Sequence, residues 1–321
     1  MKNVVAGVDI GGTNTVFGIV DKTGKVLAEG HLKTTDYPVA GNFVKALAAG
    51  IKKLMAGKKD IKLTGVGIGA PDANFHRGTI EHAPNLAWKG IVPLADMVKK
   101  EVKVPVVVTN DANAAAMGEM VFGGAKNMKD FIILTLGTGL GSGIVVDGKM
   151  VYGHTGFAGE VGHMTVVPGG RVCGCGRQGC LETYASASGL VKTVSLMISE
   201  MRDESILRNI PPSKLTSKQI AEAAAKKDPI AVRAMEYTAE KLGFGIVNSI
   251  VFTSPEAIFL FGGLAQAGEM LFAPVRKYLA KHNYVLFKNT VKILPSSISE
   301  SNGAVLGAAA LILNELSLKD S

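Results

Sequence analysis

Two hydrophobic periods alternate along this chain. Helical spacing appears in two clear stretches, at Phe43, Leu47, Ile51 and Leu54 and at Ala231, Met235, Leu242, Ile246 and Ile250. Short apolar runs that are typical of buried strands occupy residues 62–68, 104–108 and 257–261. Because strands alternate with helices, the pattern predicts a mainly parallel α/β architecture.

Polar residues mark the ends of the predicted helices. Asp228-Pro229 is typical of an N-cap followed by proline in the first turn, and Thr216 with Gln219 resembles a capping box. The last helix is expected from about residue 302 to residue 316. One of its faces is apolar and carries Val305, Ala309, Ile312 and Leu316.

A glycine-rich segment occurs twice. Residues 12–20 align without a gap on residues 137–145, and each copy follows an apolar run, at residues 4–10 and 131–136. Each copy is followed by an apolar strand and then by a turn that contains Gly-Lys. The repeat predicts two related hairpins. It therefore suggests two similar domains that face each other and offer a backbone loop to the same anion.

Length and composition set the scale of the fold. The 321 residues suit two domains that share a cleft, or one large domain, and 47% of them are hydrophobic against 19% charged. The longest apolar run, residues 304–313, is much shorter than the ~20 residues that span a bilayer. The N-terminal segment is interrupted by Asp9 too early for a signal peptide. We therefore expect a cytoplasmic protein without a membrane partner.

The formal net charge of +8 raises the question of nucleic-acid binding. No stripe of lysine and arginine with interleaved aromatic residues is present, and the basic residues occur mostly as pairs such as Lys52-Lys53. We expect a solvated basic surface and no nucleic-acid partner. Attraction of an anionic ligand such as a nucleotide is a weaker alternative.

All three cysteines lie in one short window, as Cys173, Cys175 and Cys180. With His163 they complete a tetrahedral ligand set for Zn²⁺. Buried free thiols are an alternative, and a disulfide is another, although an odd count without an export signal argues against a disulfide framework. We favour a structural zinc site. The nearby Glu160 and Glu182 suggest that it holds a substrate loop.

The first glycine turn, Asp-Ile-Gly-Gly-Thr-Asn at residues 9–14, ends a predicted strand. Its backbone N–H groups can approach phosphate oxygens closely, Asp9 can hold Mg²⁺, and Thr13 can add a hydroxyl donor. An ordinary hairpin turn is the alternative, but the second copy at residues 137–141 makes it much less convincing. The sequence matches neither a P-loop nor a dinucleotide fingerprint, because no Gly-Lys-Ser/Thr follows and the next element is a strand.

Two further segments offer chemistry with a structural alternative. Gly262-Gly263 follows the apolar run that ends at Phe261, and it can let an adenine ring lie against the backbone or can be a plain turn. Asp111, in Asn110-Asp111, opens an alanine-rich helix. The helix dipole would keep its carboxylate ionised, so that it can accept a proton from a substrate hydroxyl. Its use as a simple N-cap is an equal alternative.

Taken in order, these motifs resemble the ROK family of bacterial sugar kinases and sugar-responsive repressors. The matching segments cover nearly the whole chain and are Asp9 to Thr13, Asn110 to Asn113, Leu136 to Gly139, Glu160 to His163 and Cys173 to Glu182. The resemblance implies an α/β, actin-like ATPase (ribonuclease H-like) fold with two α/β domains around a cleft. It also implies that the C-terminal helix returns to the first domain.

The resemblance assigns roles to individual residues. Asp111 becomes the catalytic base for the 6-hydroxyl of a hexose, with ATP as phosphoryl donor and Mg²⁺ as cofactor. Residues implied to bind Mg-ATP are Asp9, Gly11, Gly12, Thr13, Asn14, Thr138, Gly139, Gly262 and Gly263. Residues implied to bind the sugar are Gly69, Asn85, Asn110, Asp111, Glu160, His163 and Glu182. Structural zinc is implied on His163, Cys173, Cys175 and Cys180.

One departure from the family pattern is visible. Many family kinases have Gly-x-Pro-Gly where this chain has Gly69-Ala-Pro71-Asp72. Aspartate does not take glycine's conformations freely, so Asp72 is not counted among the expected site residues, and it can alter which sugar fits. Glucose is the first expectation for the substrate. N-acetylmannosamine, N-acetylglucosamine, mannose and fructose are alternatives.

A sugar-sensing repressor core without catalysis is the rival from another class. Family repressors carry a helix-turn-helix domain ahead of this core, and the first predicted strand begins by residue 3 or 4, which leaves no room for one. Asp9 and Asp111 are both present, as a kinase needs. We expect a small domain of residues 1–113 plus 302–321, a large domain of residues 114–301 with the zinc loop, and a homodimer.

Overall fold

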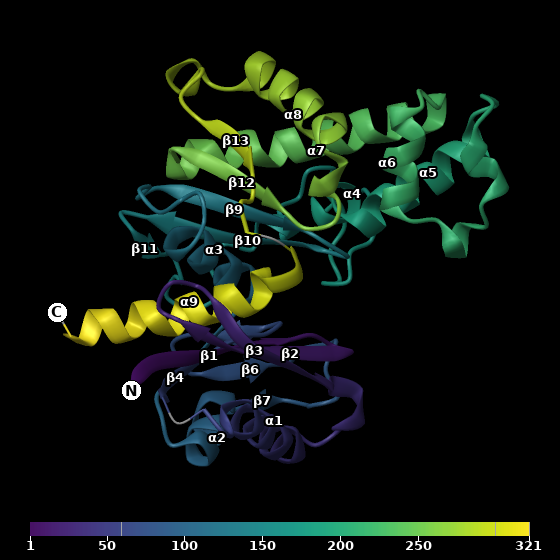
Figure 1. The fold of residues 1–321 in the computed structure, drawn as a ribbon. Coiled ribbons are helices and arrows are strands. Elements are labelled where there is room, and N and C mark those ends of the chain that lie inside the picture. The colour runs from purple at the N-terminus through teal and green to yellow at the C-terminus, as the bar shows by residue number, and fades with distance from the viewer. Residues whose placement is uncertain (59, 299, 321) are drawn as a thin grey trace.

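The structure is a computed structural model and describes residues 1–58, 60–298 and 300–320. Two lobes are each built on a five-stranded sheet with helices on both faces, and α3 and α9 lie between the two sheets (Figure 1). Within the described residues, no helix is both long enough and apolar enough to cross a membrane.

Both large sheets have the same strand order. The first is ordered β3-β2-β1-β4-β8, with β1 (Lys2–Ile10), β2 (Asn14–Asp21), β3 (Val26–Lys33), β4 (Ile61–Gly69) and β8 (Val106–Thr109). The second is ordered β11-β10-β9-β12-β13, with β9 (Phe131–Leu136), β10 (Leu140–Val146), β11 (Lys149–Met150), β12 (Ala257–Phe261) and β13 (Lys292–Pro295). The predicted duplication of a hairpin is confirmed, and it extends to the whole sheet.

The prediction of a mainly parallel architecture is wrong for the sheets, which are mixed. In the first sheet β1 pairs with β4, and β4 with β8, in parallel, whereas β1–β2 and β2–β3 are antiparallel. The second sheet repeats this arrangement. The antiparallel half follows from the glycine hairpins themselves, because short turns can join only antiparallel strands.

The gapless alignment of the two hairpins holds for their second strands but not for their turns. The closing pairs are Ile10 with Thr15 in the first hairpin and Leu136 with Leu140 in the second. The first turn is therefore one residue longer. The two glycine turns are similar in position and differ in backbone path.

The first lobe has its own core. Helices α1 (Ala40–Met55) and α2 (Leu94–Val102) cover one face of the sheet, and Phe43, Leu47 and Ile51 are buried there as the helical spacing predicted. A small sheet of β5 (Ala73–Asn74), β6 (Thr79–Glu81) and β7 (Ile91–Val92) follows β4. Ile80, Leu86 and Trp88 of the segment between β4 and α2 are buried in the same core.

The other face of the first sheet is covered by the C-terminal helix α9 (Glu300–Asp320), which is longer than predicted. Its predicted apolar face packs on Val5 and Val20 of the sheet. Gly7 and Gly67 pair in register on β1 and β4, and a Cβ on Gly7 would lie 2.0 Å from the Val305 carbonyl oxygen of α9. These glycines let the backbone of α9 lie directly on the strands, so the expected return of the last helix is confirmed.

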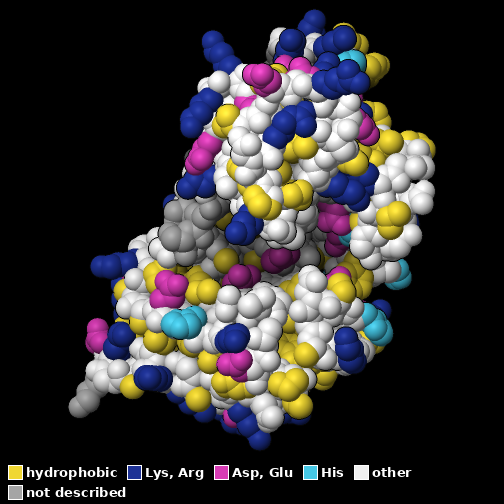
Figure 2. All heavy atoms as spheres, turned by 90° about the vertical axis from the view of Figure 1, so that its right-hand side faces the viewer, with side chains coloured by type: hydrophobic (Ala, Val, Ile, Leu, Met, Phe, Trp, Pro, Cys, Tyr) yellow, Lys and Arg dark blue, Asp and Glu magenta, His cyan; other side chains and the backbone are white. Residues whose placement is uncertain are grey.

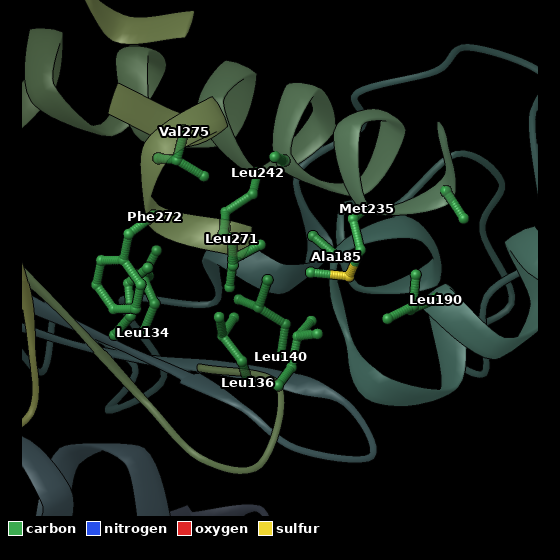
Figure 3. Close-up of a cluster of buried hydrophobic side chains, with 14 of the residues drawn as sticks. Leu134, Leu136, Leu140, Ala185, Leu190, Met235, Leu242, Leu271, Phe272 and Val275 are labelled. Atoms are coloured by element: carbon green, nitrogen blue, oxygen red, sulfur yellow. The ribbon is translucent and has the colours of Figure 1, made fainter. Parts of the chain in front are cut away.

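The second lobe contains the larger hydrophobic core. Its helices are α4 (Glu182–Ala185), α5 (Ala187–Glu200), α6 (Ser217–Ala225), α7 (Pro229–Thr253) and α8 (Glu269–His282). Leu134, Leu136 and Leu140 of the sheet face Leu271, Phe272 and Val275 of α8 and Met235 and Leu242 of α7 (Figure 3). Asp228 caps α7 ahead of Pro229, and Thr216 forms a capping box with Gln219, so both predicted helix starts are confirmed.

Candidate active site

Parallel strands bring three predicted site residues to one edge of the first sheet. Asp9, near the end of β1, pairs with Gly69, the last residue of β4, and Gly69 pairs with Thr109 of β8. Asp111 begins helix α3 (Asp111–Val121) two residues later. A Cβ on Gly69 would lie 3.8 Å from Asp9 Oδ1 and 3.6 Å from the Cα of Asp111. Two carboxylates therefore meet where the parallel strands end, which is where open α/β sheets bind ligands.

The start of α3 separates the two alternatives for Asp111. Asn110, rather than Asp111, is the N-cap, because its Oδ1 accepts the N–H of Ala112 at 2.8 Å. Asp111 occupies the first helical position, and its Oδ1 accepts the same N–H at 2.8 Å. The interpretation of Asp111 as the N-cap is therefore wrong. Its second carboxylate oxygen has no hydrogen-bond partner among the described residues.

The electrostatics of this edge differ from the expectation for Asp111. Burial among the surrounding protein raises the pKa of Asp111 above its ordinary value, and hydrogen bonds from the α3 backbone only partly offset this. Desolvation therefore outweighs the hydrogen bonds at the helix terminus in setting the direction of this pKa shift. Burial and then the Asp111 charge raise the pKa of Asp9 to about 7. A raised pKa is typical of a carboxylate that takes part in proton transfer near neutral pH.

The two glycine turns are each held against a neighbour. A Cβ on Gly12 would lie 2.7 Å from the Asn85 carbonyl oxygen, so the first turn packs on the loop that carries Asn85. The second turn is bonded to α5, because the N–H of Ala187 donates to the Gly137 carbonyl at 2.8 Å. Gly262 has φ +95°, and its Cβ would lie 2.9 Å from the Leu136 carbonyl oxygen. Only glycine fits there without strain, and Gly262-Gly263 thus borders the second turn.

A cavity of about 810 Å³ opens between the two lobes. Acidic side chains gather in the hollow between them (Figure 2). Predicted site residues that line the cavity are Asn85, Thr138, Gly139, His163 and Glu182. A small hollow beside it is lined by Asn110 and Glu160. The volume of the larger cavity, about 810 Å³, suits a hexose together with part of a nucleotide.

Glu160, His163 and Glu182 form one polar cluster. His163 Nε2 lies 4.0 Å from Glu160 Oε2, and His163 Nδ1 lies 3.8 Å from Glu182 Oε1. Glu182 also reaches the second glycine turn, where its Oε2 accepts the N–H of Leu140 at 3.3 Å. Glu182 thereby connects the histidine to the turn that was predicted to bind phosphate.

The fold brings the three cysteines and His163 together as a candidate metal site. Their ligand atoms all lie within 4.8 Å of one another. A tetrahedron with zinc-like bond lengths has S···S edges of about 3.8 Å and S···N edges of about 3.6 Å. The Cys175 Sγ–Cys180 Sγ distance is 3.7 Å, and the Cys173 Sγ–His163 Nδ1 distance is 3.6 Å. These two distances match those edges, and with Nδ1 of His163 facing the cysteines its Nε2 is left for another partner.

A family model described as the ROK family matches residues 5–315. The chain belongs to the ROK family. A glucokinase from Halalkalibacterium halodurans is 36% identical over 277 residues, which cover 85% of this chain and 84% of that protein. A solved structure of a ROK family glucokinase from Streptomyces griseus, in complex with glucose and AMPPNP, has a TM-score of 0.80 at 36% identity and covers 96% of this chain and 98% of that one. The expected actin-like ATPase fold is thereby confirmed.

Similarity within the ROK family also reaches a repressor. The xylose repressor of Caldicellulosiruptor bescii is 32% identical over 255 residues, which cover 79% of this chain and 63% of that protein. Membership of the ROK family alone therefore does not separate an enzyme from a sensor. The residues of the site must therefore decide between an enzyme and a sensor.

Two residues that the sequence analysis did not identify, Arg177 and Ser142, stabilise the cysteine loop and the loop around Glu160 of this ROK protein. Arg177 donates to the His163 carbonyl at 2.8 Å, which joins the cysteine loop to the histidine. Ser142 of β10 donates to the Gly159 carbonyl and accepts the N–H of Val161 at 3.2 Å, so it fixes the backbone on both sides of Glu160. Such supports carry no motif of their own, because their partners are distant in sequence.

Two residues that line the cavity of this ROK protein were also missed. Lys192 of α5 is exposed, lies at the end that holds Thr138 and is the only lysine or arginine lining the cavity among the described residues. Asp72 lines the same cavity although it was left out of the expected site. Its φ of +51° means that aspartate has adopted the left-handed conformation that glycine usually takes.

The two lobes also touch beside the site. Phe75 stacks on Tyr152 with ring centroids 4.0 Å apart, and Asn74 Nδ2 donates to the Thr155 carbonyl at 2.8 Å. His76 Nε2 lies 2.9 Å from the Gly153 carbonyl oxygen. These contacts join the loop after Asp72 to the segment that leads into Glu160. The position of the Asp72 carboxylate is therefore linked through the backbone to that of the Glu160 carboxylate.

Proposed function

We propose that this chain is an ATP-dependent hexose kinase that transfers the γ-phosphoryl group of ATP to the 6-hydroxyl of glucose. The observation that carries the proposal is the meeting of Asp9 and Asp111 at the carboxyl edge of the first sheet, beside a cavity lined by the second glycine turn and by Asn85, on which the first turn packs. A sensor that only binds sugar does not need the second carboxylate. The similarity to glucokinases supports the same conclusion.

In this mechanism Asp111 is the general base. Its free carboxylate oxygen accepts the proton of the 6-hydroxyl while that oxygen forms a bond to the γ-phosphorus and the bond to the β-phosphate oxygen breaks. The products are glucose 6-phosphate and ADP. The raised pKa of Asp111 makes it a stronger proton acceptor than an ordinary aspartate. Positioning and charge neutralisation supply most of the catalysis in such reactions.

The nucleotide lies between the glycine turns in this proposal. Its phosphates are bound by Gly11, Gly12, Thr13, Asn14, Thr138 and Gly139, and its adenosine lies against Gly262 and Gly263. Asp9 would hold Mg²⁺, directly or through water, which neutralises phosphate charge when bound. Oxygen donors of this kind are the ligands that Mg²⁺ prefers.

The sugar lies at the acidic end of the cavity. We assign its hydroxyl contacts to Gly69, Asn85, Asn110, Glu160, His163 and Glu182. We further propose that the tetrahedral site holds zinc on His163, Cys173, Cys175 and Cys180. Zinc on Nδ1 of His163 would fix the ring and its tautomer, which leaves the Nε2 N–H to donate to a sugar hydroxyl or to Glu160.

A coupled ADP-release assay with Mg-ATP tests the function. The panel contains glucose, mannose, fructose, N-acetylglucosamine and N-acetylmannosamine. Turnover mainly on glucose supports the proposal, and turnover mainly on another member keeps the mechanism and changes the substrate. Absence of turnover with every sugar, together with measurable sugar binding, would favour a sugar-sensing core without catalysis.

We expect Lys192→Ala to raise the KM for Mg-ATP about tenfold, with the KM for glucose nearly unchanged. Lys192 is the only lysine or arginine lining the cavity among the described residues, and it lies near the turn that we assign to the phosphates. A charge-assisted contact with phosphate is consistent with that magnitude. Initial rates at varied ATP check it, with Lys218→Ala on α6 as an exposed control. Equal ATP kinetics in both variants would refute a phosphate contact.

We expect the affinity for free Mg²⁺ to increase as the pH rises through about 7. The pKa of Asp9 is raised to about 7, so the carboxyl group is largely neutral below that pH and attracts a cation only after it loses its proton. The half-saturating Mg²⁺ concentration at fixed Mg-ATP should therefore fall between pH 6 and pH 8. The Asp9→Asn variant should lose this dependence. A dependence that persists in the variant would assign it to another group.

The organisation of the chain remains a proposal in two respects. We propose a small domain of residues 1–113 plus 302–321 and a large domain of residues 114–301, supported by the separate cores of the two sheets. We also propose a homodimer. Support comes from exposed apolar side chains at Val251, Phe252, Tyr284, Val285 and Leu286.

A further inference from the structure

Asp72 has a left-handed backbone conformation and a carboxylate without a hydrogen-bond partner among the described residues. It lines the cavity together with Asn85 and His163. Its φ is +51°, and its carbonyl oxygen accepts the N–H of Glu81 at 3.0 Å, which holds the turn. Its carboxylate makes no hydrogen bond or ion pair with any other part of the chain that the structure describes. The position is therefore maintained by the backbone, and the carboxylate is free for a ligand.

The surroundings of Asp72 identify the end of the cavity that it serves. Its charge acts on Glu160 and Asp111, and the charge of His163 acts on it in turn. Partial burial raises the pKa of Asp72, and His163 opposes this effect. A partly desolvated acceptor among other carboxylates gains from a neutral donor such as a hydroxyl group. Asp72 thus belongs to the sugar end.

On the basis of the hexose kinase function above, we propose that Asp72 is a specificity-determining residue whose carboxylate accepts a hydrogen bond from a hydroxyl group of an unsubstituted hexose. Its side chain also fills space in the cavity that glycine would leave open. The bulk of the side chain therefore disfavours N-acetylated sugars, and the hydrogen bond adds to this preference for glucose where its partner is the hydroxyl group that the N-acetyl group replaces. A site that hydrogen-bonds a substrate hydroxyl discriminates strongly against ligands that leave its polar group unpaired.

Two substitutions and a matched control test the proposal. Asp72→Gly removes the acceptor and suits the left-handed backbone, and Asp72→Asn keeps the shape but weakens the acceptor. Asp147 has φ +49° in the exposed turn between β10 and β11 and does not line the cavity, so Asp147→Gly controls for the backbone change. Thermal unfolding of each variant checks that the fold is retained.

We expect Asp72→Gly to weaken glucose binding and raise the KM for glucose about tenfold to hundredfold, with kcat changed much less. Asp72→Asn should give a smaller loss, and Asp147→Gly none. The ratio of kcat/KM for glucose to that for N-acetylglucosamine should fall at least about tenfold in Asp72→Gly. Unchanged glucose affinity and unchanged selectivity in both Asp72 variants would overturn the proposal. Because Asp72→Asn is isosteric, its glucose affinity and selectivity test the proposal if Asp72→Gly does not fold.

Calorimetric binding of monodeoxyglucoses, each lacking one hydroxyl at positions 1 to 4, identifies the hydroxyl group. The sugar that lacks it should bind wild type and Asp72→Asn equally, while the others lose affinity in the variant. Equal losses for all four sugars would refute the hydrogen bond. These binding measurements require no turnover. A protein that binds glucose but does not phosphorylate it would contradict the kinase function alone, and the role of Asp72 in sugar binding would still be tested.

Discussion

Asp111→Asn should lower kcat for glucose by about 10²–10⁴-fold while glucose affinity stays within about threefold. Asparagine cannot take up the proton of the attacking hydroxyl, but its side-chain oxygen can still accept the N–H of Ala112. Helix α3 also keeps its cap, because Asn110 provides it. The loss should therefore fall on the chemical step rather than on folding or binding. ADP release gives kcat, and calorimetry gives the sugar affinity.

The control for this variant is Asp96→Asn, which removes another carboxylate from the first turn of a helix, on the exposed side of α2. It should leave kcat and affinity unchanged. If Asp111→Asn retained more than about a tenth of the wild-type kcat, another group would have to accept the proton. Loss of glucose binding in the same variant would instead make Asp111 mainly a binding residue.

Cys175→Ser should release the metal ion and lower kcat/KM for glucose by about a hundredfold. Cys175 offers one of the four ligand atoms of the proposed metal site, which in our proposal also fixes His163 and the loop between Glu160 and Glu182. A displacement of about 1 Å in such positioning groups is enough for a loss of this size. Because Cys175 is exposed whereas Cys173 and Cys180 are buried, this substitution disturbs the core least.

Metal content is measured by mass spectrometry on the wild type and on the variant. A chelator should produce the same loss of activity in the wild type, and added Zn²⁺ should restore it there but not in Cys175→Ser. A metal-free protein with normal glucose affinity would contradict the role of the site in positioning the sugar loop. Restoration by a different metal ion would correct the identity of the ion and keep the role.

Local signals were readable from the sequence. The glycine hairpin occurs twice, and the positions where apolar runs end placed Asp9, Gly69 and Asp111 at strand ends. Parallel neighbours then had to bring these ends to one edge of the sheet. The cysteine spacing likewise predicted a ligand set whose atoms the fold brings together.

What the sequence could not supply depends on packing between distant segments. Glu182 meets Leu140, and Ser142 fixes the backbone around Glu160, through contacts that no periodic pattern encodes. The raised pKa of Asp111 depends on the protein that surrounds it rather than on its place at a helix terminus. Asp72 was excluded because aspartate does not take glycine's conformations freely, and the structure shows that this aspartate nevertheless adopts the left-handed conformation.

The docking of α9 on the first sheet has a consequence for synthesis on the ribosome. Strands β1 to β8 emerge first, but the face formed around Val5 and Val20 is covered by α9, which starts at Glu300. The second lobe, which is complete in sequence before α9, can bury its core earlier. The first lobe must therefore keep an apolar face exposed to solvent until α9 has been made, and during this interval the nascent chain is most prone to aggregation.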